Sequence, residues 1–187
     1  MIKAVIFDYF GVISSDDYWQ FVKKEHGNQD DFNALALRVN TGEIHWREFV
    51  DSTASKLKKT SDEVNELYAF QKINTMVVGL IHNLHKTYKT GLITNASHEL
   101  VDAIIEANHF QDIFDTIVVS SRLGITKPDP RIFQYALKEL EVQPEEAIYI
   151  DDAARNVDAA SALGMHAFVF ENFVQTEQQL QNILAQA

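Results

Sequence analysis

The sequence predicts an α/β protein: a doubly wound parallel sheet with helices on both faces and a small helical domain inserted after the first strand. Two observations predict this class. Five short runs rich in Val and Ile are continuously hydrophobic, as strands covered on both faces must be. Helical patterns separate the later runs, a rhythm typical of right-handed βαβ crossovers. We expect the strands at Lys3–Phe7, Thr90–Thr94, Thr116–Val119, Ala147–Asp151 and Ala167–Phe170.

The helices between these strands are expected at Ser97–Asn108, Arg131–Leu140 and Ala153–Leu163. The Gln-rich C-terminal segment also has helical spacing, with Leu180, Ile183 and Leu184 on one face. Thr176 followed by Gln179 matches a capping box, so we expect a terminal helix that begins there rather than a disordered tail.

The stretch from about Ser14 to Lys72 breaks the βαβ rhythm because it contains no convincing strand. Its apolar residues recur every three or four positions, and Thr60 with Glu63 forms a capping box, so we expect roughly four helices. The predicted division is a core of residues 1–13 and 73–187 and a helical cap of residues 14–72, with Ser14 and Ser15 at the hinge. An insertion here lies at the carboxyl end of the sheet, where open α/β folds bind ligands, so it is either a lid or a helical extension that only packs.

Composition restricts the possible functions. The chain has 187 residues, 46% of them hydrophobic, and a formal net charge of −11, which argues against a nucleic-acid-binding protein. It contains no cysteine, which excludes disulfides, thiol catalysis and thiolate metal sites. No segment approaches the roughly 20 apolar residues that span a bilayer, and we see no signal peptide. We therefore expect a cytoplasmic protein with no membrane partner; the sequence carries no signal for its oligomeric state.

Polar residues follow the first two predicted strands. Asp8 comes directly after Phe7, and Thr94 and Asn95 end the second strand. An aspartate leaving a strand is often only a turn former, and Asn95 or Ser97 could simply cap the next helix. The alternative is a carboxylate facing a hydroxyl and backbone N–H groups, the groups that bind an anion at a helix N-terminus.

Two further signals lie later in the chain. Lys127 precedes Pro128 and Pro130, which stiffen its loop and start the next helix, although a solvated surface lysine would look the same. Asp151 and Asp152 end the fourth strand, where Asp152 could be a helix cap. Adjacent acids repel each other, so the alternative is a divalent ion; Mg²⁺ prefers oxygen ligands and shares carboxylates with phosphates.

Taken together and in this order, Asp8, Thr94, Lys127 and the Asp151–Asp152 pair resemble the four motifs of the haloacid dehalogenase-like hydrolase superfamily. The resemblance covers the whole chain, including a small helical cap of the C1 type after the first motif. It implies a Rossmann-like core in which the first and fourth strands are neighbours, so that Asp8 and the aspartate pair converge.

The resemblance also implies a mechanism. Asp8 would be the nucleophile that forms an aspartyl-phosphate. Mg²⁺ would be held by Asp8, the Phe10 backbone carbonyl and Asp152, with Asp151 on the metal or just behind its ligands. Lys127 would neutralise both Asp8 and the phosphoryl group. The implied catalytic set is Asp8, Lys127 and Thr94.

The phosphate itself would be bound by Lys127, the Thr94 hydroxyl and the Asn95 N–H group, again by resemblance. Asn156 lies one helical turn beyond Asp152 and would orient Lys127 or the metal ligands. The expected substrate is a small phosphorylated metabolite such as a sugar phosphate.

Phe10 departs from the family pattern, because most phosphatases of this superfamily carry there a second aspartate that serves as general acid and base. Such help is typically worth about 10² to 10⁴ in rate. Three interpretations stay open: a phosphatase with another proton donor or an undemanding leaving group, a 2-haloacid dehalogenase-type hydrolase, or a non-catalytic phosphate-binding module. The acid pair favours phosphoryl chemistry, because dehalogenases need no metal.

The cap is expected to set specificity. Its candidate pocket residues are Tyr18, Trp19, Arg38, His45 and Trp46, although aromatic residues at helical spacing can simply form the cap's own core. In the core, His98 follows the Thr94–Asn95 loop and is a candidate for the missing proton donor.

Overall fold

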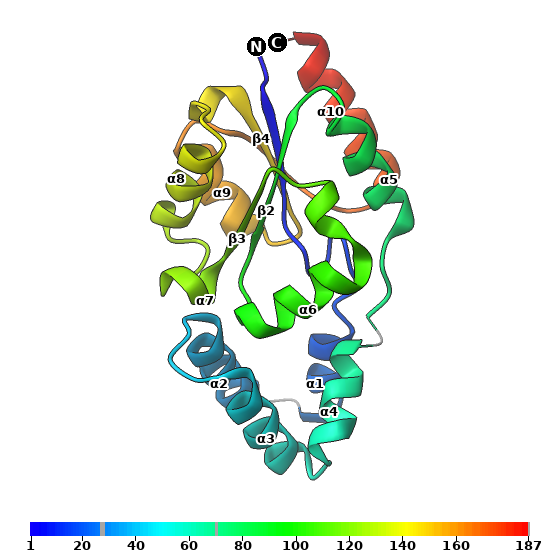
Figure 1. Cartoon of the computed structure of the whole chain (residues 1–187), viewed down its shortest axis with the longest axis vertical. Coiled ribbons are helices and arrows are strands. Elements are labelled where there is room, and N and C mark those ends of the chain that lie inside the picture. Colours follow the sequence, from blue (N-terminus) through cyan, green and yellow to red (C-terminus); the bar gives the residue numbers. More distant parts are fainter. Residues whose placement is uncertain (27–28, 70, 187) are drawn as a thin grey trace.

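The computed structural model describes residues 1–26, 29–69 and 71–186 of the chain. They form one five-stranded parallel sheet in the order β3-β2-β1-β4-β5 (Figure 1). The strands are β1 (Ala4–Phe7), β2 (Lys89–Thr94), β3 (Thr116–Val119), β4 (Ala147–Asp151) and β5 (His166–Val169). Each lies within one residue of its predicted position at either end, and β1 and β4 are neighbours as expected.

The register of the central strands brings two acidic residues together. Phe7 of β1 pairs with Ile150 of β4, and the next backbone N–H, that of Asp8, donates to the Ile150 carbonyl over 2.9 Å. Parallel strands end at the same edge of a sheet. Asp8 therefore lies beside Asp151 at the carboxyl end of the sheet, 143 positions apart in the sequence but adjacent in the fold.

Helices cover both faces of the sheet (Figure 1). One face packs against α5 (Thr75–Leu84), α6 (His98–Asn108) and α10 (Phe173–Gln186), and the other against α8 (Pro130–Glu139) and α9 (Ala154–Ala162). Both faces of β1 and β4 are buried, which explains why their sequences show no alternation. No sequence pattern separately predicted α5, the short α7 (Ser120–Leu123), or the 3₁₀ turns η1 (Phe110–Asp112) and η2 (Pro144–Glu146).

The inserted segment consists of α1 (Asp17–His26), α2 (Asp30–Asn40), α3 (Trp46–Leu57) and α4 (Ser61–Ala69), which confirms the predicted helical insertion. These helices enclose a separate apolar cluster that includes Tyr18, Phe32, Phe49 and Val64. The Thr60 capping box is present: the Glu63 N–H donates to Thr60 Oγ1 over 3.2 Å, and the Thr60 N–H donates to Glu63 Oε2 over 2.8 Å.

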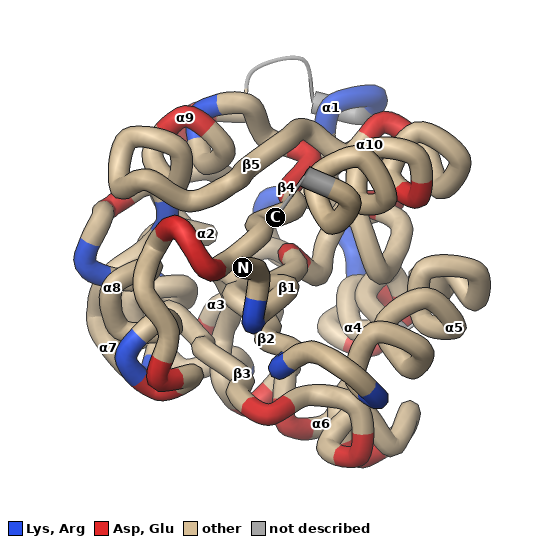
Figure 2. The backbone as a smooth tube through the Cα atoms, turned by 90° about the horizontal axis from the view of Figure 1, so that it is seen from above, with Lys and Arg blue, Asp and Glu red and all other residues tan. Residues whose placement is uncertain are grey.

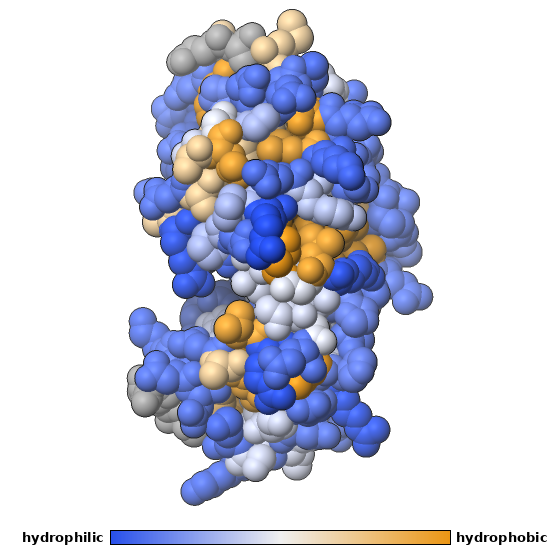
Figure 3. All heavy atoms as spheres, turned by 90° about the vertical axis from the view of Figure 1, so that its left-hand side faces the viewer, coloured by the Kyte–Doolittle hydropathy of each residue, from blue (hydrophilic) through white to orange (hydrophobic). Residues whose placement is uncertain are grey.

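Two chain segments connect the cap to the core, and they run side by side. The Ser15 N–H donates to the Lys72 carbonyl over 2.9 Å, and the Asn74 N–H donates to the Ile13 carbonyl over 2.8 Å. The hinge at Ser14 and Ser15 and the exact domain boundaries stay predictions. In a side view the molecule narrows where the core meets the cap (Figure 3).

The turn between α2 and α3 rests on the core. Ser120 Oγ donates to the Asn40 carbonyl over 2.6 Å, and Glu99 Oε1 lies 3.2 Å from His45 Nδ1 and 3.4 Å from the Trp46 N–H. Gly42 has a φ of +72°, and a Cβ added there would lie 2.6 Å from a core carbonyl oxygen. Only glycine fits this close approach.

The terminal helix begins earlier than predicted. It starts at Phe173, and Asn172 Oδ1 accepts from the Gln175 N–H over 3.0 Å as the cap. The capping-box prediction for Thr176 was wrong: its hydroxyl lies inside the first turn and donates back to the Asn172 carbonyl over 2.9 Å.

The distribution of charged residues and the apolar length of the helices bear on nucleic-acid and membrane partners. Along the described backbone, Lys and Arg alternate with Asp and Glu around the molecule instead of forming one basic surface (Figure 2). Among the helices of the described residues, none is long and apolar enough to cross a membrane.

Candidate active site

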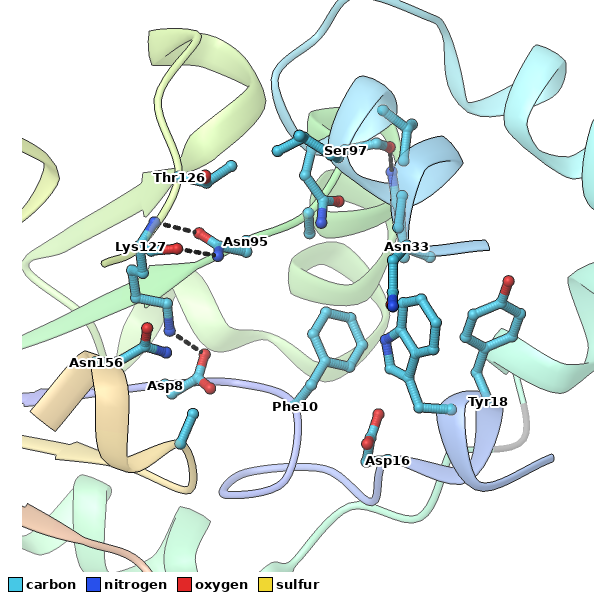
Figure 4. A pocket seen from close by; sticks show the side chains of 18 of the residues that line it. Asp8, Phe10, Asp16, Tyr18, Asn33, Asn95, Ser97, Thr126, Lys127 and Asn156 are labelled. Carbon is cyan, nitrogen blue, oxygen red and sulfur yellow. Dashed lines mark hydrogen bonds and ion pairs between the residues drawn. The ribbon is translucent and has the colours of Figure 1, made fainter. Parts of the chain in front are cut away.

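A buried lysine joins two carboxylates at the carboxyl end of the sheet. Lys127 Nζ lies 2.7 Å from Asp8 Oδ1 (Figure 4). It also lies 2.8 Å from Asp151 Oδ2 and donates to the Ile93 carbonyl over 3.0 Å. The Lys127 side chain is 2% exposed and that of Asp151 is 0% exposed. The interpretation of Lys127 as a solvated surface residue was therefore wrong, because its ammonium has three partners and almost no contact with water.

Burial and charge shift the pKa values of this group in different directions. Burial raises the pKa of Asp8 to about 7, against the opposing effect of Lys127. Burial would also raise the pKa of Asp151, but Lys127 and several hydrogen bonds hold it below its usual value. Burial would lower the pKa of Lys127, and the two carboxylates raise it instead. Lys127 thus stays charged, and both Asp8 and Asp151 pair with its ammonium group.

Several hydrogen-bond donors besides Lys127 hold the Asp151 carboxylate. The Tyr149 hydroxyl donates to its Oδ2, Asn156 Nδ2 lies 3.0 and 3.1 Å from its two oxygens, and the Ala153 N–H donates to Oδ1 over 2.8 Å. Asp151 therefore positions Lys127, and Asn156 acts on Lys127 through it. The alternative in which Asp152 caps α9 was wrong, since Ala153 occupies the cap position without a side-chain bond.

The same edge of the sheet offers a set of oxygen ligands. One carboxylate oxygen from each of Asp8, Asp151 and Asp152 lies within 4.8 Å of the others. Asp152 is exposed and its carboxylate lies against Gly11, where an added Cβ would come within 2.3 Å of Oδ2. Burial and then Asp151 raise the pKa of Asp152. A hard divalent cation fits this set, because it prefers anionic oxygen ligands and would offset their repulsion.

Asn95 has a role that the sequence did not suggest. Its side chain pairs with the backbone of Lys127 in both directions: Oδ1 accepts from the N–H over 2.8 Å and Nδ2 donates to the carbonyl over 3.0 Å (Figure 4). The cap of α6 is Ser97, whose hydroxyl accepts from the Leu100 N–H over 3.2 Å. Asn95 thus fixes the Lys127 loop and leaves helix capping to its neighbour.

Thr94 ends β2 with a fully buried side chain. Its hydroxyl has no hydrogen-bond partner in the described part of the chain, and Thr94 is not among the residues on the cavity wall. A buried hydroxyl without a partner costs free energy, and a ligand oxygen reaching the strand end would remove that cost.

A cavity of about 690 Å³ lies between the core and the cap, a size suited to a small molecule. Tyr18, Trp19 and Trp46 line it as expected. Arg38 and His45 do not, so these two predictions were wrong: Arg38 pairs with Glu43 over 2.7 Å on the cap surface, and His45 contacts the core at Glu99. The wall of the cavity also includes Asp8, Phe10, Asp16, Asn33, Phe49, Tyr68, Gln71, Asn95, Lys127, Asp152, Arg155 and Asn156.

His98 is not placed to donate a proton in this cavity. Its Nδ1 lies 3.4 Å from Ser121 Oγ and 3.3 Å from Glu99 Oε2, and the residue is absent from the cavity wall. Asp16, on the wall, was missed because an aspartate just before a helix reads as a cap. Tyr149 was missed too, although its position two residues before Asp151 puts both on one strand face.

Known proteins share this sequence pattern and fold. Over 159 residues the chain is 30% identical to acyl-CoA dehydrogenase family member 10 of Mus musculus, covering 79% of this chain but only 15% of that protein. It is 27% identical over 204 residues to D-ribitol-5-phosphate phosphatase of Bacteroides thetaiotaomicron, covering 98% and 99% of the two chains. A HAD family enzyme of the same bacterium, crystallised with magnesium and inorganic phosphate, shares the fold with a TM-score of 0.75 and 21% identity over 91% of this chain and 95% of its own.

The family assignment rests on sequence as well as on fold. Residues 2–164 match the family model described as haloacid dehalogenase-like hydrolase, which spans the core and the cap. The chain belongs to the haloacid dehalogenase-like hydrolases.

Proposed function

We propose that the protein is a Mg²⁺-dependent phosphatase of a small phosphorylated metabolite, with Asp8 as nucleophile. The observation that carries this proposal is the state of the Asp8 carboxylate. Its Oδ1 accepts from the Tyr9 N–H and pairs with Lys127, both over 2.7 Å, while its Oδ2 receives no hydrogen bond from the described residues. Asp8 lines the cavity, so a free, oriented oxygen borders the space that a substrate would occupy.

In the first step Asp8 attacks phosphorus, and in the second step water releases phosphate from the aspartyl group. A phosphate monoester repels a carboxylate, so positive charge must be present where the two meet. Lys127 provides it, held by Asp151 on one side and by the Asn95 pairing of its backbone on the other. Thr94 Oγ1 and the Asn95 N–H are the proposed ligands of the remaining phosphate oxygens.

Asp8, Asp152 and the Phe10 carbonyl are the proposed ligands of Mg²⁺, which supplies a second positive charge next to the phosphoryl group. We place Asp151 behind these ligands, because its oxygens already serve Lys127, Tyr149, Asn156 and the Ala153 N–H. The oxygen-only donor set and the short separation of the three carboxylates support this choice of ion.

The cavity favours a polyol or sugar phosphate. Its cap side combines aromatic faces, among them Trp19 and Trp46, with the amides of Asn33 and Gln71. Aromatic faces pack against the C–H side of such molecules, while amides bond their hydroxyl groups. The full-length similarity to an enzyme named for ribitol 5-phosphate supports the same substrate class.

Turnover of phosphate esters tests this proposal. With Mg²⁺ present, we expect hydrolysis of 4-nitrophenyl phosphate and of members of a panel of sugar and polyol phosphates that includes D-ribitol 5-phosphate. Asp8→Asn should lower kcat by a factor of about 10⁴ or more. Asp112→Asn, the same change at an exposed acid of η1, is the matched control and should leave turnover unchanged.

Other outcomes would favour the alternatives. Activity that persists in excess chelator would remove the metal from the proposal. Release of chloride from 2-chloropropionate without phosphatase activity would show a dehalogenase-type hydrolase. Binding of inorganic phosphate without turnover of any ester would show a phosphate-binding module.

A further inference from the structure

We propose that Asp16, at the junction of the core and the cap, donates the proton to the leaving oxygen and then accepts one from the attacking water. This inference rests on the proposed phosphatase function and assigns the residue that does what Phe10 cannot. Phe10 lines the cavity with a ring that carries no exchangeable proton.

The local structure gives Asp16 no structural task. It directly precedes α1, where an aspartate ordinarily accepts a hydrogen bond from the N–H of the second or third helical residue. Here the Asp16 carbonyl accepts from the Gln20 N–H over 3.2 Å, but the carboxylate takes no hydrogen bond and no ion pair from any described residue. A half-buried carboxyl without a partner is costly, which points to a role outside the packing of the helix.

The Asp16 carboxylate lies on the wall of the cavity that contains the proposed nucleophile. Asp16 lines the same cavity as Asp8, Phe10 and Asp152. In Figure 4 its oxygens point into the space below the Phe10 ring, on the cap side of Asp8. An ester bound with phosphorus at Asp8 has its leaving oxygen directed away from the core, because attack and departure are in line. The leaving group therefore departs toward the side from which Asp16 enters the cavity.

The environment also suits a group that must hold a proton near neutral pH. Burial first, and then the charges of Asp152, after β4, and Asp17, the first residue of α1, together raise the pKa of Asp16 to about 7. Tyr68 of α4 is the other titratable group that its charge affects. An acid poised near the working pH can both give and take a proton.

Other titratable residues on the cavity wall are less suited to the role. Asp8 and Asp152 are the proposed nucleophile and metal ligand. Burial raises the pKa of Tyr68 well above its usual value, so it would not release a proton readily at neutral pH. Asp16 is the remaining carboxyl group among the described residues that line the cavity.

Two steps transfer the phosphoryl group first to Asp8 and then to water. A bond forms between Asp8 Oδ2 and phosphorus while the bond from phosphorus to the ester oxygen breaks; that oxygen keeps the electron pair and takes the Asp16 proton, leaving as an alcohol. Asp16, now a carboxylate, then takes a proton from water as the water oxygen attacks phosphorus. The bond to Asp8 breaks and returns its electron pair to the Asp8 carboxylate, so Asp16 is protonated again.

Leaving-group dependence tests this role, because a good leaving group needs no proton. The probes are phenyl phosphate and 2,4-dinitrophenyl phosphate, two aryl esters that differ mainly in the basicity of the departing oxygen. For Asp16→Asn we expect kcat/KM on phenyl phosphate, which reports the phosphoryl transfer to Asp8, to fall by about 10² to 10⁴, while kcat/KM on the dinitrophenyl ester stays within about threefold. The later attack of water is common to both esters, so the loss of its base should lower kcat for both. Activity on the dinitrophenyl ester also shows that the variant is folded.

Asp112→Asn is again the matched control, since it makes the same change at an exposed acid of η1 that is not on the wall of this cavity. Both esters should be hydrolysed by this control as by the unchanged protein. Equal losses of kcat/KM on both esters in Asp16→Asn, or no loss on either, would overturn the role of Asp16. Failure of the unchanged protein to hydrolyse either ester would instead overturn the phosphatase proposal itself.

Discussion

The two sides of the cavity are built differently. On the core side, Lys127 and Asp151 are almost fully buried, and each has at least three polar partners that come from different strands and loops. On the cap side, aromatic rings stack on one another, with centroids of Trp46 and Phe49 5.2 Å apart, and the Asp16 carboxylate has no hydrogen-bond partner among the described residues. The core side is a fixed network of charges; the cap side is a packed apolar surface with one free acid.

This difference separates two tasks. A buried charge network tolerates almost no displacement, because each removed partner leaves another charge without compensation. Aromatic packing is less directional and can accommodate different ligands. We therefore expect changes on the core side to decide whether the protein folds and turns over any ester, and changes on the cap side to decide how well each ester is used.

The largest effect is expected from Lys127→Met, which keeps the length of the side chain but removes its charge. Asp8 and Asp151 would then face each other without their shared cation. We expect the free energy of unfolding to fall by about 3–5 kcal/mol and turnover to be lost. Urea unfolding with and without Mg²⁺ measures the first, and ester hydrolysis the second.

The pH dependence of that variant has a definite sign. The pKa of Asp8 is raised from 3.8 to about 7 in the folded protein, so its contribution to stability is present below about pH 4 and is lost as pH rises through about 7. Without Lys127 this loss should grow, so the variant should be most destabilised at alkaline pH. Lys138→Met, at an exposed site on α8, is the control. If Lys127→Met were as stable as Lys138→Met at both pH 5 and pH 8, the buried-network interpretation would be contradicted.

A smaller effect on the core side is expected from Gly11→Ala. The residue has a φ of +85°, and the new Cβ would come within 2.3 Å of Asp152 Oδ2, so the Asp152 carboxylate must leave its present position. We expect Mg²⁺ affinity to fall by about 10- to 100-fold, as for other changes that shift a metal ligand. Isothermal titration measures this affinity directly.

Gly79→Ala is a matched control, because nothing lies within 4 Å of a Cβ added there. In the interior of α5 this change should raise stability by about 1 kcal/mol and leave metal affinity unchanged. Unaltered Mg²⁺ binding in Gly11→Ala would show that Asp152 is not a ligand.

The core side of the site could be predicted from the sequence because a small number of simple patterns mark its residues. Continuous apolar runs mark buried strands, and the ends of parallel strands meet at one edge of the sheet. That the first and fourth strands are neighbours, so that Asp8 and the pair Asp151–Asp152 converge, came from the family resemblance. Lys127 was marked by the two prolines that stiffen its loop. What these patterns could not give was the pairing of Asn95 with the Lys127 backbone, because 32 residues and a crossover separate the two.

The cap side was harder to predict, since it depends on how helices dock. Periodicity identified the helices and their aromatic residues but not which way each surface side chain points. Arg38 pairs with Glu43, five residues later, and His45 contacts the core residue Glu99. Neither contact follows from helical spacing. Asp16 could not be told from an ordinary helix cap without knowing that its carboxylate leaves the helix end unbonded.

The smallest effect is expected where the cap touches the core. Glu99 of α6 is the only described side chain that accepts from both the His45 ring, over 3.2 Å, and the Trp46 N–H, over 3.4 Å. Glu99→Gln keeps an acceptor but removes its charge, so the cap should close less firmly while the core network stays intact. We expect KM for 4-nitrophenyl phosphate to rise about two- to fivefold with kcat nearly unchanged, because partly exposed ion pairs contribute little. Glu106→Gln, at an exposed position on the same helix, should change neither constant. A fall in kcat with unchanged KM in Glu99→Gln would contradict the expectation that this contact acts only on closure of the cap.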